Sequence, residues 1–474
     1  MNSIRLIVVR TLGIAAVMLS AGLAFADHPN IVVILADDMG YGDSGCYNPD
    51  SKCPTPNIDR LASQGMRFTD AHTAGSVCVP SRYGLLTGCY PFRTKLDWRH
   101  NAVIAEGRPT VASLLNENGY ATAMVGKWHL GFDGGPDYDW SQPLRGGPTD
   151  RGFETYFGMP ASLDIPPYYY IRGRRPVQPP TETVAASATE GWSPIQGAFW
   201  REGQVAPGFR HAEVLDRFAS EAVTAIEQQA TQQQPFFLYV ALTGPHTPWL
   251  PGEEFGGKGS AGLYSEFVAH VDDVVGRVLT ALDDAGAADE TLVLFTSDNG
   301  PVWYETDEQR FGHASVGPLR GMKGDAWDGG HRVPFIVRWP GQVEPGSTSD
   351  ALVGFVDLFA TLADVVGAPV PADAAEDSVS FLPVLLGKQS SARTTMVQHH
   401  SGTVLRDGSW KLINHLGSGG FSKPRRQEPD PGGPRGQLYN LADDPGEQNN
   451  LWQSEPERVQ RMLEELKAIR AGKR

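Results

Sequence analysis

Five short apolar runs rich in β-branched residues stand out along the chain, and each is followed by polar, glycine or proline residues. The first, residues 30–35, reads Asn-Ile-Val-Val-Ile-Leu, with no alternation of polar and apolar positions after the asparagine. Uninterrupted apolar runs of this length are typical of strands that are buried on both faces. The same pattern predicts strands over residues 120–125, 235–243, 291–296 and 333–337.

Segments with apolar residues three and four positions apart separate these runs and predict amphipathic helices. The predicted helices cover residues 56–65, 110–118, 213–228, 263–285 and 355–366. Strands that alternate with helices in this way indicate a mainly parallel sheet covered by helices on both faces. The fold class predicted for this part of the chain is therefore α/β.

The pattern changes after residues 369–377, where the apolar runs become shorter and follow one another without long helices. Short strands are predicted over residues 394–399, 402–405, 410–414 and 438–441, followed by a charged helix over 455–471. This arrangement predicts a small antiparallel sheet with one helix packed on it. Residues 131–210, rich in glycine, proline and aromatic residues, are interpreted as an insertion over the active face, with a solvated surface loop as the alternative.

The first 26 residues have the features of a secretory signal peptide. Arg5 and Arg10 precede an apolar run at 14–23, and Ala24-Phe25-Ala26 is a small-residue cleavage site. The run is shorter than the roughly 18 apolar residues that a membrane span needs, although a retained anchor is the alternative. We expect an exported protein, periplasmic or secreted, with cleavage near Ala26 and no membrane span.

The amino-acid composition limits the classes of molecule that the protein is expected to bind. The formal net charge is −15 over 474 residues, which argues against nucleic acid, because nucleic-acid binding requires a basic face. An anionic ligand would therefore need a local basic pocket. Of the four cysteines, Cys46 and Cys53 are close enough in sequence to form a disulfide in an oxidising compartment, although the sequence alone does not decide this.

Polar residues follow four of the predicted strands and meet, in a parallel sheet, at one edge. Their carboxylate and amide oxygens form a ligand set suited to a hard divalent cation, calcium in preference to magnesium, because no rigid octahedron is implied. A complementary set of basic residues lies in neighbouring loops marked by glycine or proline. The acidic and amide set is Asp37, Asp38, Asp298 and Asn299; the basic set is Arg82, Lys127, His129, His246 and Lys323.

A single cysteine occupies a position suited to anion chemistry. Pro80 fits the first position of a helix, and Cys78 then lies just ahead of that helix, where backbone N–H groups and the helix dipole favour an anion. Arg82 follows about one turn later. The alternative is a buried structural thiol.

Two stretches resemble the signatures of a known family, the type I sulfatases. Residues 78–88 read Cys-Val-Pro-Ser-Arg-Tyr-Gly-Leu-Leu-Thr-Gly and resemble the first signature, and residues 119–129, ending in Gly-Lys-Trp-His, resemble the second. The resemblance covers nearly the whole mature chain. It implies an alkaline-phosphatase-like fold, with a catalytic domain over 27–375 and a C-terminal α+β subdomain over 376–474. It also implies a calcium ion and oxidation of Cys78 to Cα-formylglycine by a maturation enzyme.

The same resemblance implies roles for individual residues. Asp37, Asp38, Asp298 and Asn299 would hold calcium together with an oxygen of the modified Cys78. Arg82 and Lys127 would hold the formylglycine hydrate, and Lys323 would bind the substrate sulfate. We expect His246, assisted by Lys323, to protonate the departing alcohol, and His129 to take a proton from the second hydroxyl of the hydrate. Val79 and Met322 depart from the family pattern, which usually has smaller residues there.

The substrate is less sharply indicated. Residues 168–170 (Tyr-Tyr-Tyr) and Arg172 would suit a sugar with anionic groups, and Asp164 or His313 a sugar hydroxyl; plain loop packing is the alternative for each. Resemblance to exported sulfatases with long loops favours a sulfated carbohydrate. The alternatives are aryl or other small sulfate esters, a phosphomonoesterase or phosphodiesterase of the same superfamily, and a non-enzymatic binder of sulfated glycans. Cys78 and Asn299 argue against the phosphoesterases.

Overall fold

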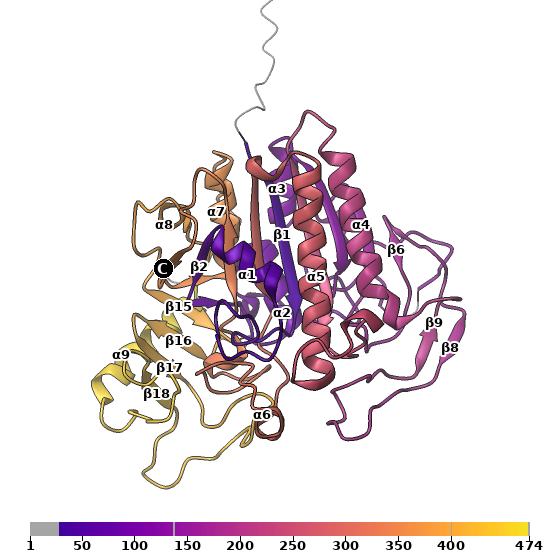
Figure 1. Ribbon diagram of the computed structural model, residues 1–474. Helices are drawn as coiled ribbons and strands as arrows, with labels where there is room; N and C mark the ends of the chain where they lie inside the picture. The colour runs from indigo at the N-terminus through magenta and orange to yellow at the C-terminus, as the bar shows by residue number, and fades with distance from the viewer. Residues whose placement is uncertain (1–27, 136–137, 400, 473–474) are drawn as a thin grey trace, which may run out of the picture.

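A ten-stranded mixed sheet forms the centre of the protein (Figure 1). The computed structural model describes residues 28–135, 138–399 and 401–472, so the predicted signal peptide lies outside the described residues. The strand order is β13-β2-β12-β11-β1-β10-β4-β5-β6-β7. Five neighbours in the middle, β11, β1, β10, β4 and β5, run parallel. Their bounds are β1 Asn30–Asp37, β4 Ala121–Lys127, β5 Thr155–Met159, β10 Phe236–Pro245 and β11 Thr291–Ser297.

Both edges of the sheet are built from shorter strands. On one side β12 pairs antiparallel with β11 and β2, and β13 pairs parallel with β2. On the other, β6 and β7 continue antiparallel from β5. A separate two-stranded pair joins β3 to β14. The bounds are β2 Met66–Phe68, β3 Ala71–His72, β6 Ile171–Arg172, β7 Arg175–Pro176, β12 Phe335–Arg338, β13 Ser347–Ser349 and β14 Val353–Gly354.

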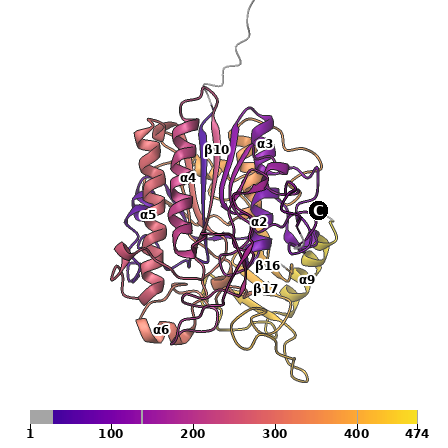
Figure 2. The ribbon, with the colours of Figure 1, turned by 90° about the vertical axis from the view of Figure 1, so that its right-hand side faces the viewer.

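Helices cover both faces of this sheet, as the sequence predicts. Figure 2 shows α4 and α5 on one side of the sheet and α2 and α3 on the other. The first face carries α1 Pro56–Ser63, α4 Val214–Gln229 and α5 Gly262–Asp284; the second carries α2 Cys78–Thr87, α3 Val111–Glu117 and α7 Leu358–Val365. Two further short helices are α6 Glu305–Phe311 and α8 Leu382–Leu385. The α/β class is confirmed.

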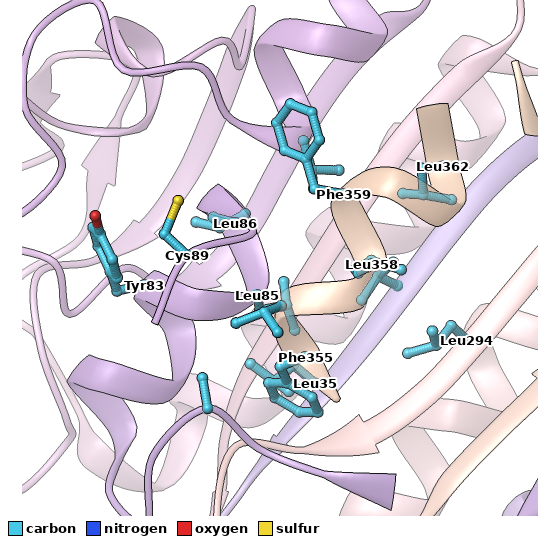
Figure 3. Close-up of a cluster of buried hydrophobic side chains, with 14 of the residues drawn as sticks. Leu35, Tyr83, Leu85, Leu86, Cys89, Leu294, Phe355, Leu358, Phe359 and Leu362 are labelled. Carbon is cyan, nitrogen blue, oxygen red and sulfur yellow. The ribbon is translucent and has the colours of Figure 1, made fainter. Parts of the chain in front are cut away.

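The central strand explains why the sequence shows no alternation there. Ile31, Val33 and Leu35 belong to one buried cluster, and Val32 and Ile34 to the other. All five side chains are fully buried. On the face that carries α2 and α7, Leu35 lies beside Leu85 of α2, Phe355 of the turn before α7, and Leu358, the first residue of α7 (Figure 3). Burial on both faces removes the polar positions that an exposed strand would have.

The C-terminal region forms the predicted antiparallel sheet, with strand order β15-β16-β17-β18 and α9 packed on β16 and β17. Side chains of α9, including Met462 and Leu466, join the same buried cluster as Leu35, so the small sheet is packed against the large one. The bounds are β15 Thr395–Gln398, β16 Val404–Asp407, β17 Trp410–Ile413, β18 Gln437–Asn440 and α9 Pro456–Arg470.

Residues 131–210 are not simply an insertion over the active face, so that interpretation was wrong in part. Within this segment β5 is a parallel strand of the main sheet, and β6 and β7 extend its edge. Among the described residues of this segment, the strands outside the main sheet are β8 Glu182–Val184 and β9 Gly203–Val205, which pair antiparallel with each other. The strands β5, β6 and β7 have five, two and two residues, too few for a periodic pattern to emerge among the surrounding glycines and prolines.

The cysteines do not form a disulfide. All four are free, and Cys53 lies against His313, whereas Cys46 contacts Ser44. No helix among the described residues is long and apolar enough to cross a membrane.

Candidate active site

The ends of four neighbouring parallel strands bring the predicted residues together. Asp37 ends β1 and Lys127 ends β4, while His246 and Asp298 directly follow β10 and β11. Asp38 and His129 adopt left-handed backbone conformations, with φ of 66° and 56°. Such conformations are uncommon outside glycine and concentrate at functional sites.

The acidic and amide side chains form one buried group. Asn299 donates from Nδ2 to Asp38 Oδ1 at 2.6 Å, and the backbone N–H of Asp38 donates to Asp298 Oδ1 at 3.2 Å. Asp37 and Asp298 share Arg82, whose Nη2 lies 3.8 and 2.8 Å from their Oδ2 atoms. All of these residues are buried, with at most 3% of their surface exposed.

Cys78 is the first residue of α2, not the residue ahead of it. Val77 is the extended N-cap, so Pro80 occupies the third helical position and not the first as predicted. The Cys78 Sγ lies 3.5 Å from both Asp37 Oδ1 and Lys323 Nζ. Burial is the largest cause, and the negative charge of Asp298 the second, that raises the pKa of this thiol far above its usual range. An unmodified Cys78 is therefore not a thiolate.

The cations of the site are held in fixed positions by the carboxylates. Arg82 Nε donates to Asp298 Oδ2 at 2.9 Å and its Nη1 to the Lys127 carbonyl oxygen at 2.9 Å. Lys127 Nζ pairs with Asp37 Oδ2 at 2.5 Å, and Lys323 Nζ pairs with Asp38 Oδ1. Burial alone would raise the pKa of Asp37, but Lys127 and, to a smaller extent, His246 and Arg82 hold it below its usual value.

The two histidines lie in different environments. His246 uses Nδ1 against the Thr247 carbonyl oxygen at 2.6 Å, and its Nε2 lies 3.7 Å from Asp38 Oδ2. His129 has Nδ1 3.5 Å from Ser162 Oγ, and its buried Nε2 has no hydrogen-bond partner within the described part of the chain. Burial, then Lys127, lowers the pKa of His129 well below its usual range, so its imidazole is neutral and able to accept a proton.

The donor set fits a calcium ion. Asn299 Nδ2 is occupied by Asp38 and the Gly300 carbonyl, whereas its Oδ1 is buried with no partner among residues 28–135, 138–399 and 401–472. An orphaned amide oxygen beside three buried carboxylates matches the all-oxygen ligation that calcium prefers. Ligand atoms of Asp37, Asp38, Cys78 and His246 also lie within 4.8 Å of one another, which adds a nitrogen donor beside the predicted oxygen set.

A pocket of about 410 Å³ opens onto this group. Asp164, predicted to contact substrate, lines it with Oδ1 3.9 Å from His246 Nδ1. Arg201 lines it too and pairs with Asp164 Oδ2. The site residues that line the pocket are Asp38, Cys78, His129, Asp164, His246 and Lys323.

The structure does not bring the other two predicted substrate residues to this pocket. His313 is fully buried behind the site, where its Nε2 lies 2.8 Å from Asp43 Oδ1. Arg172 lies on β6, where it pairs with Glu221 at 2.7 Å and covers the ring of Phe157. The tyrosines at 168 and 169 are fully buried, so loop packing is their role.

Trp98, Arg201 and Phe421 are among the residues of the pocket lining that were not predicted from the sequence. The Trp98 ring meets His129 edge-on at 4.4 Å between centroids, which orients the imidazole. None of the three belongs to a signature or follows a predicted strand of the main sheet. Only the folded chain brings them to the site.

Comparison with known proteins settles the family. The Sulfatase family model matches residues 29–368, well over half of the chain. The chain belongs to the sulfatase family. A second family model, N-sulphoglucosamine sulphohydrolase, C-terminal, matches residues 323–414 of this sulfatase. The assignment confirms the resemblance and favours an enzyme over a non-enzymatic glycan binder or a phosphoesterase.

Individual relatives are similar over nearly the whole sulfatase. N-acetylgalactosamine-6-O-sulfatase of Bacteroides thetaiotaomicron is 34% identical, and the match covers 94% of each chain. Human arylsulfatase A is 35% identical over 91% of this chain and 85% of its own. A solved structure described under metabolism of multiple glycosaminoglycans by Bacteroides thetaiotaomicron has a TM-score of 0.82 at 32% identity, covering 94% of this chain and all of that one.

Proposed function

We propose that this sulfatase releases sulfate from a sulfated carbohydrate, using Cα-formylglycine made from Cys78 and a bound calcium ion. The observation that carries this is the position of Cys78, whose Sγ lies between Lys323 and Asp37 at the inner end of the pocket. The relative named N-acetylgalactosamine-6-O-sulfatase supports the carbohydrate class, and N-acetylgalactosamine 6-sulfate is the substrate to test first.

Asp37, Asp38, Asp298 and Asn299 would hold the calcium ion. When present, the hydrated formylglycine would supply the nucleophile, and the calcium ion would neutralise negative charge on the sulfate. Arg82 and Lys127 would hold the formylglycine hydrate. Asp298 and Asp37 keep these two cations in place, so they are oriented before charge develops on the leaving oxygen. Lys323 would bind the sulfate, a role supported by its Nζ, which faces the Cys78 Sγ.

His246 is suited to protonate the leaving alcohol. Its Nδ1 donates to the Thr247 carbonyl oxygen, which leaves Nε2 to carry the exchanged proton on the pocket side. His129 is suited to the opposite task, since its lowered pKa keeps Nε2 free to accept a proton from residue 78.

A second candidate substrate class is an aryl or other small sulfate ester. Leu96, Trp98 and Ile165 give the pocket apolar walls, and arylsulfatase A is among the relatives. Sulfated sugars and aryl sulfates differ in the alcohol that leaves, so activity assays on one substrate of each class distinguish the two candidates.

The test uses protein produced with a formylglycine-generating enzyme, which is the expected maturation partner. Sulfate release is measured from N-acetylgalactosamine 6-sulfate and from 4-nitrophenyl sulfate. We expect many turnovers on the sugar, a lower kcat/KM on the aryl ester, and at most one slow turnover from Cys78→Ser, because a serine has one hydroxyl and cannot eliminate the sulfate. Sustained turnover by that variant would contradict the role of residue 78.

Export also belongs to this proposal. We expect cleavage near Ala26 and a periplasmic or secreted mature protein, with the catalytic domain over 27–375 and the C-terminal subdomain over 376–474. Amino-terminal sequencing of the protein from a periplasmic fraction tests the cleavage site.

A further inference from the structure

The C-terminal region contributes an exposed aromatic side chain to the pocket. Phe421 is 40% exposed, while most of the large apolar side chains in the described chain are buried. It is also one of the residues that line the 410 Å³ pocket. An exposed aromatic side chain at the edge of a ligand pocket is a candidate contact for the ligand.

The loop that carries Phe421 is fixed to the segment after Lys323. The N–H of Ala326 donates to the Ser418 carbonyl at 2.7 Å, and the N–H of Ser422 donates to Asp325 Oδ1 at 3.0 Å. Ser418 Oγ also donates to the Ser422 carbonyl at 2.7 Å. Phe421 therefore stays in position relative to the lysine that faces Cys78.

Two glycines allow this close contact. A Cβ on Gly420 would lie 2.0 Å from the Gly324 carbonyl carbon, and a Cβ on Gly324 would lie 3.1 Å from the Phe421 ring. Gly324 itself has a φ of 85°. The aromatic ring thus rests directly on the residue after Lys323.

Lining residues of the pocket differ in their exposure to solvent. Cys78 is 5% exposed and lies beside the buried Lys323, whereas Phe421 is 40% exposed and is the most exposed apolar residue of the lining. Asp164 and Arg201 also line the pocket, but most of the other lining residues are apolar. A substrate with its sulfate at Cys78 therefore meets Phe421 with an apolar part nearer the solvent and not with the sulfate.

We propose that Phe421 is a specificity-determining residue, which packs against the sugar ring attached to the sulfated unit of an oligosaccharide. This rests on the proposed function. Sugar rings present C–H faces that pack on aromatic side chains, and this contact lies outside the reacting centre. Phe421 accordingly selects disaccharide or longer substrates over the sulfated monosaccharide and acts through KM.

The test compares kcat and KM on N-acetylgalactosamine 6-sulfate with those on a disaccharide that carries the same unit at its non-reducing end. We expect Phe421→Ala to lose about tenfold in kcat/KM on the disaccharide through KM, with little change on the monosaccharide. Phe421→Tyr should restore the preference. Val370→Ala, at a residue 38% exposed and outside the pocket lining, is the matched control and should change neither substrate.

The outcomes separate the two proposals. Equal values for wild type and Phe421→Ala on the disaccharide, or equal losses on both substrates at unchanged Tm, would overturn the role of Phe421 and leave the proposed function intact. Absence of sulfate release from both sugars by matured wild-type protein would overturn the proposed function together with this one.

Discussion

Asn299 shows how one side chain is divided between structure and metal binding. Its Nδ2 is occupied by Asp38 and Gly300, so only Oδ1 is left for an ion. We predict that Asn299→Ala weakens calcium binding at least tenfold. The measurement is the rise in Tm of the chelator-treated protein as calcium is added. Asn449→Ala, an exposed asparagine, is the control. An unchanged calcium titration in Asn299→Ala would contradict the assigned ligand set.

The proposed roles of His246 and His129 depend differently on the leaving group of the substrate. A general acid matters most when the departing alcohol is a poor leaving group, as a sugar hydroxyl is. We predict that His246→Asn lowers kcat on the sulfated sugar by about 10²–10⁴-fold and has a much smaller effect on 4-nitrophenyl sulfate. His129→Asn should lower turnover of both esters, because regeneration of residue 78 is common to them. Equal losses for His246→Asn on both esters would remove its role as acid.

At the scale of the element, β4 passes very close to β10 just before Lys127. Gly126 has a φ of 116°, and a Cβ there would lie 1.8 Å from the Ala241 carbonyl oxygen. We predict that Gly126→Ala costs about 3 kcal/mol or more in the free energy of unfolding, because backbone must move. Gly446→Ala, where the nearest atom is 3.7 Å away, should cost less than about 1 kcal/mol. Urea unfolding measures both, and similar losses would contradict the steric argument.

The elements also show what a sequence can predict. The strand predicted over residues 30–35, observed as Asn30–Asp37, was indicated by an unbroken apolar run that reflects burial on both faces. The residues at its end could be assigned because parallel strands end at one edge of the sheet. The strands β6 and β7 have two residues each and leave no pattern. His313 was predicted as a possible contact for a sugar hydroxyl, with loop packing as the alternative, and its hydrogen bond to Asp43 holds it in the interior.

The whole molecule depends on contacts between regions distant in sequence. Phe421 and Arg201 line the pocket, yet neither lies near a signature, so no local pattern reveals them. A buried polar network likewise joins the small C-terminal sheet to the segment that precedes β12: Lys411 of β17 pairs with Asp328 at 2.6 Å and lies 3.4 Å from His331 Nε2. Such networks form only after the chain has folded, and their members are scattered along the sequence.

This network predicts acid sensitivity. His72 and His331 are fully buried with their Nδ1 atoms 3.0 Å apart, and burial is the main cause that lowers the pKa of both. Between the lowered folded-state pKa and the ordinary value near 6.5, the unfolded chain binds protons that the folded protein does not. The contribution of each buried histidine to the free energy of unfolding is therefore fully present above about pH 6.5. Below that pH the contribution falls by up to about 1.4 kcal/mol per pH unit.

We predict that the Tm of the His331→Gln variant falls less between pH 7 and pH 5 than the Tm of the wild-type protein. The exposed His100→Gln should retain the wild-type dependence. Thermal unfolding monitored by circular dichroism at several pH values measures the slope. A slope in His331→Gln equal to that of wild type would show that the buried pair is not the cause.

The central claim is that Cys78 becomes the catalytic group of a sulfatase, and the most direct measurement is the mass of the tryptic peptide from Phe68 to Arg82. The protein is produced with and without a formylglycine-generating enzyme. The account predicts a peptide lighter by the thiol-to-aldehyde difference and captured by a carbonyl reagent, in proportion to the sulfate-releasing activity of the preparation. An unmodified Cys78 in fully active protein would contradict it.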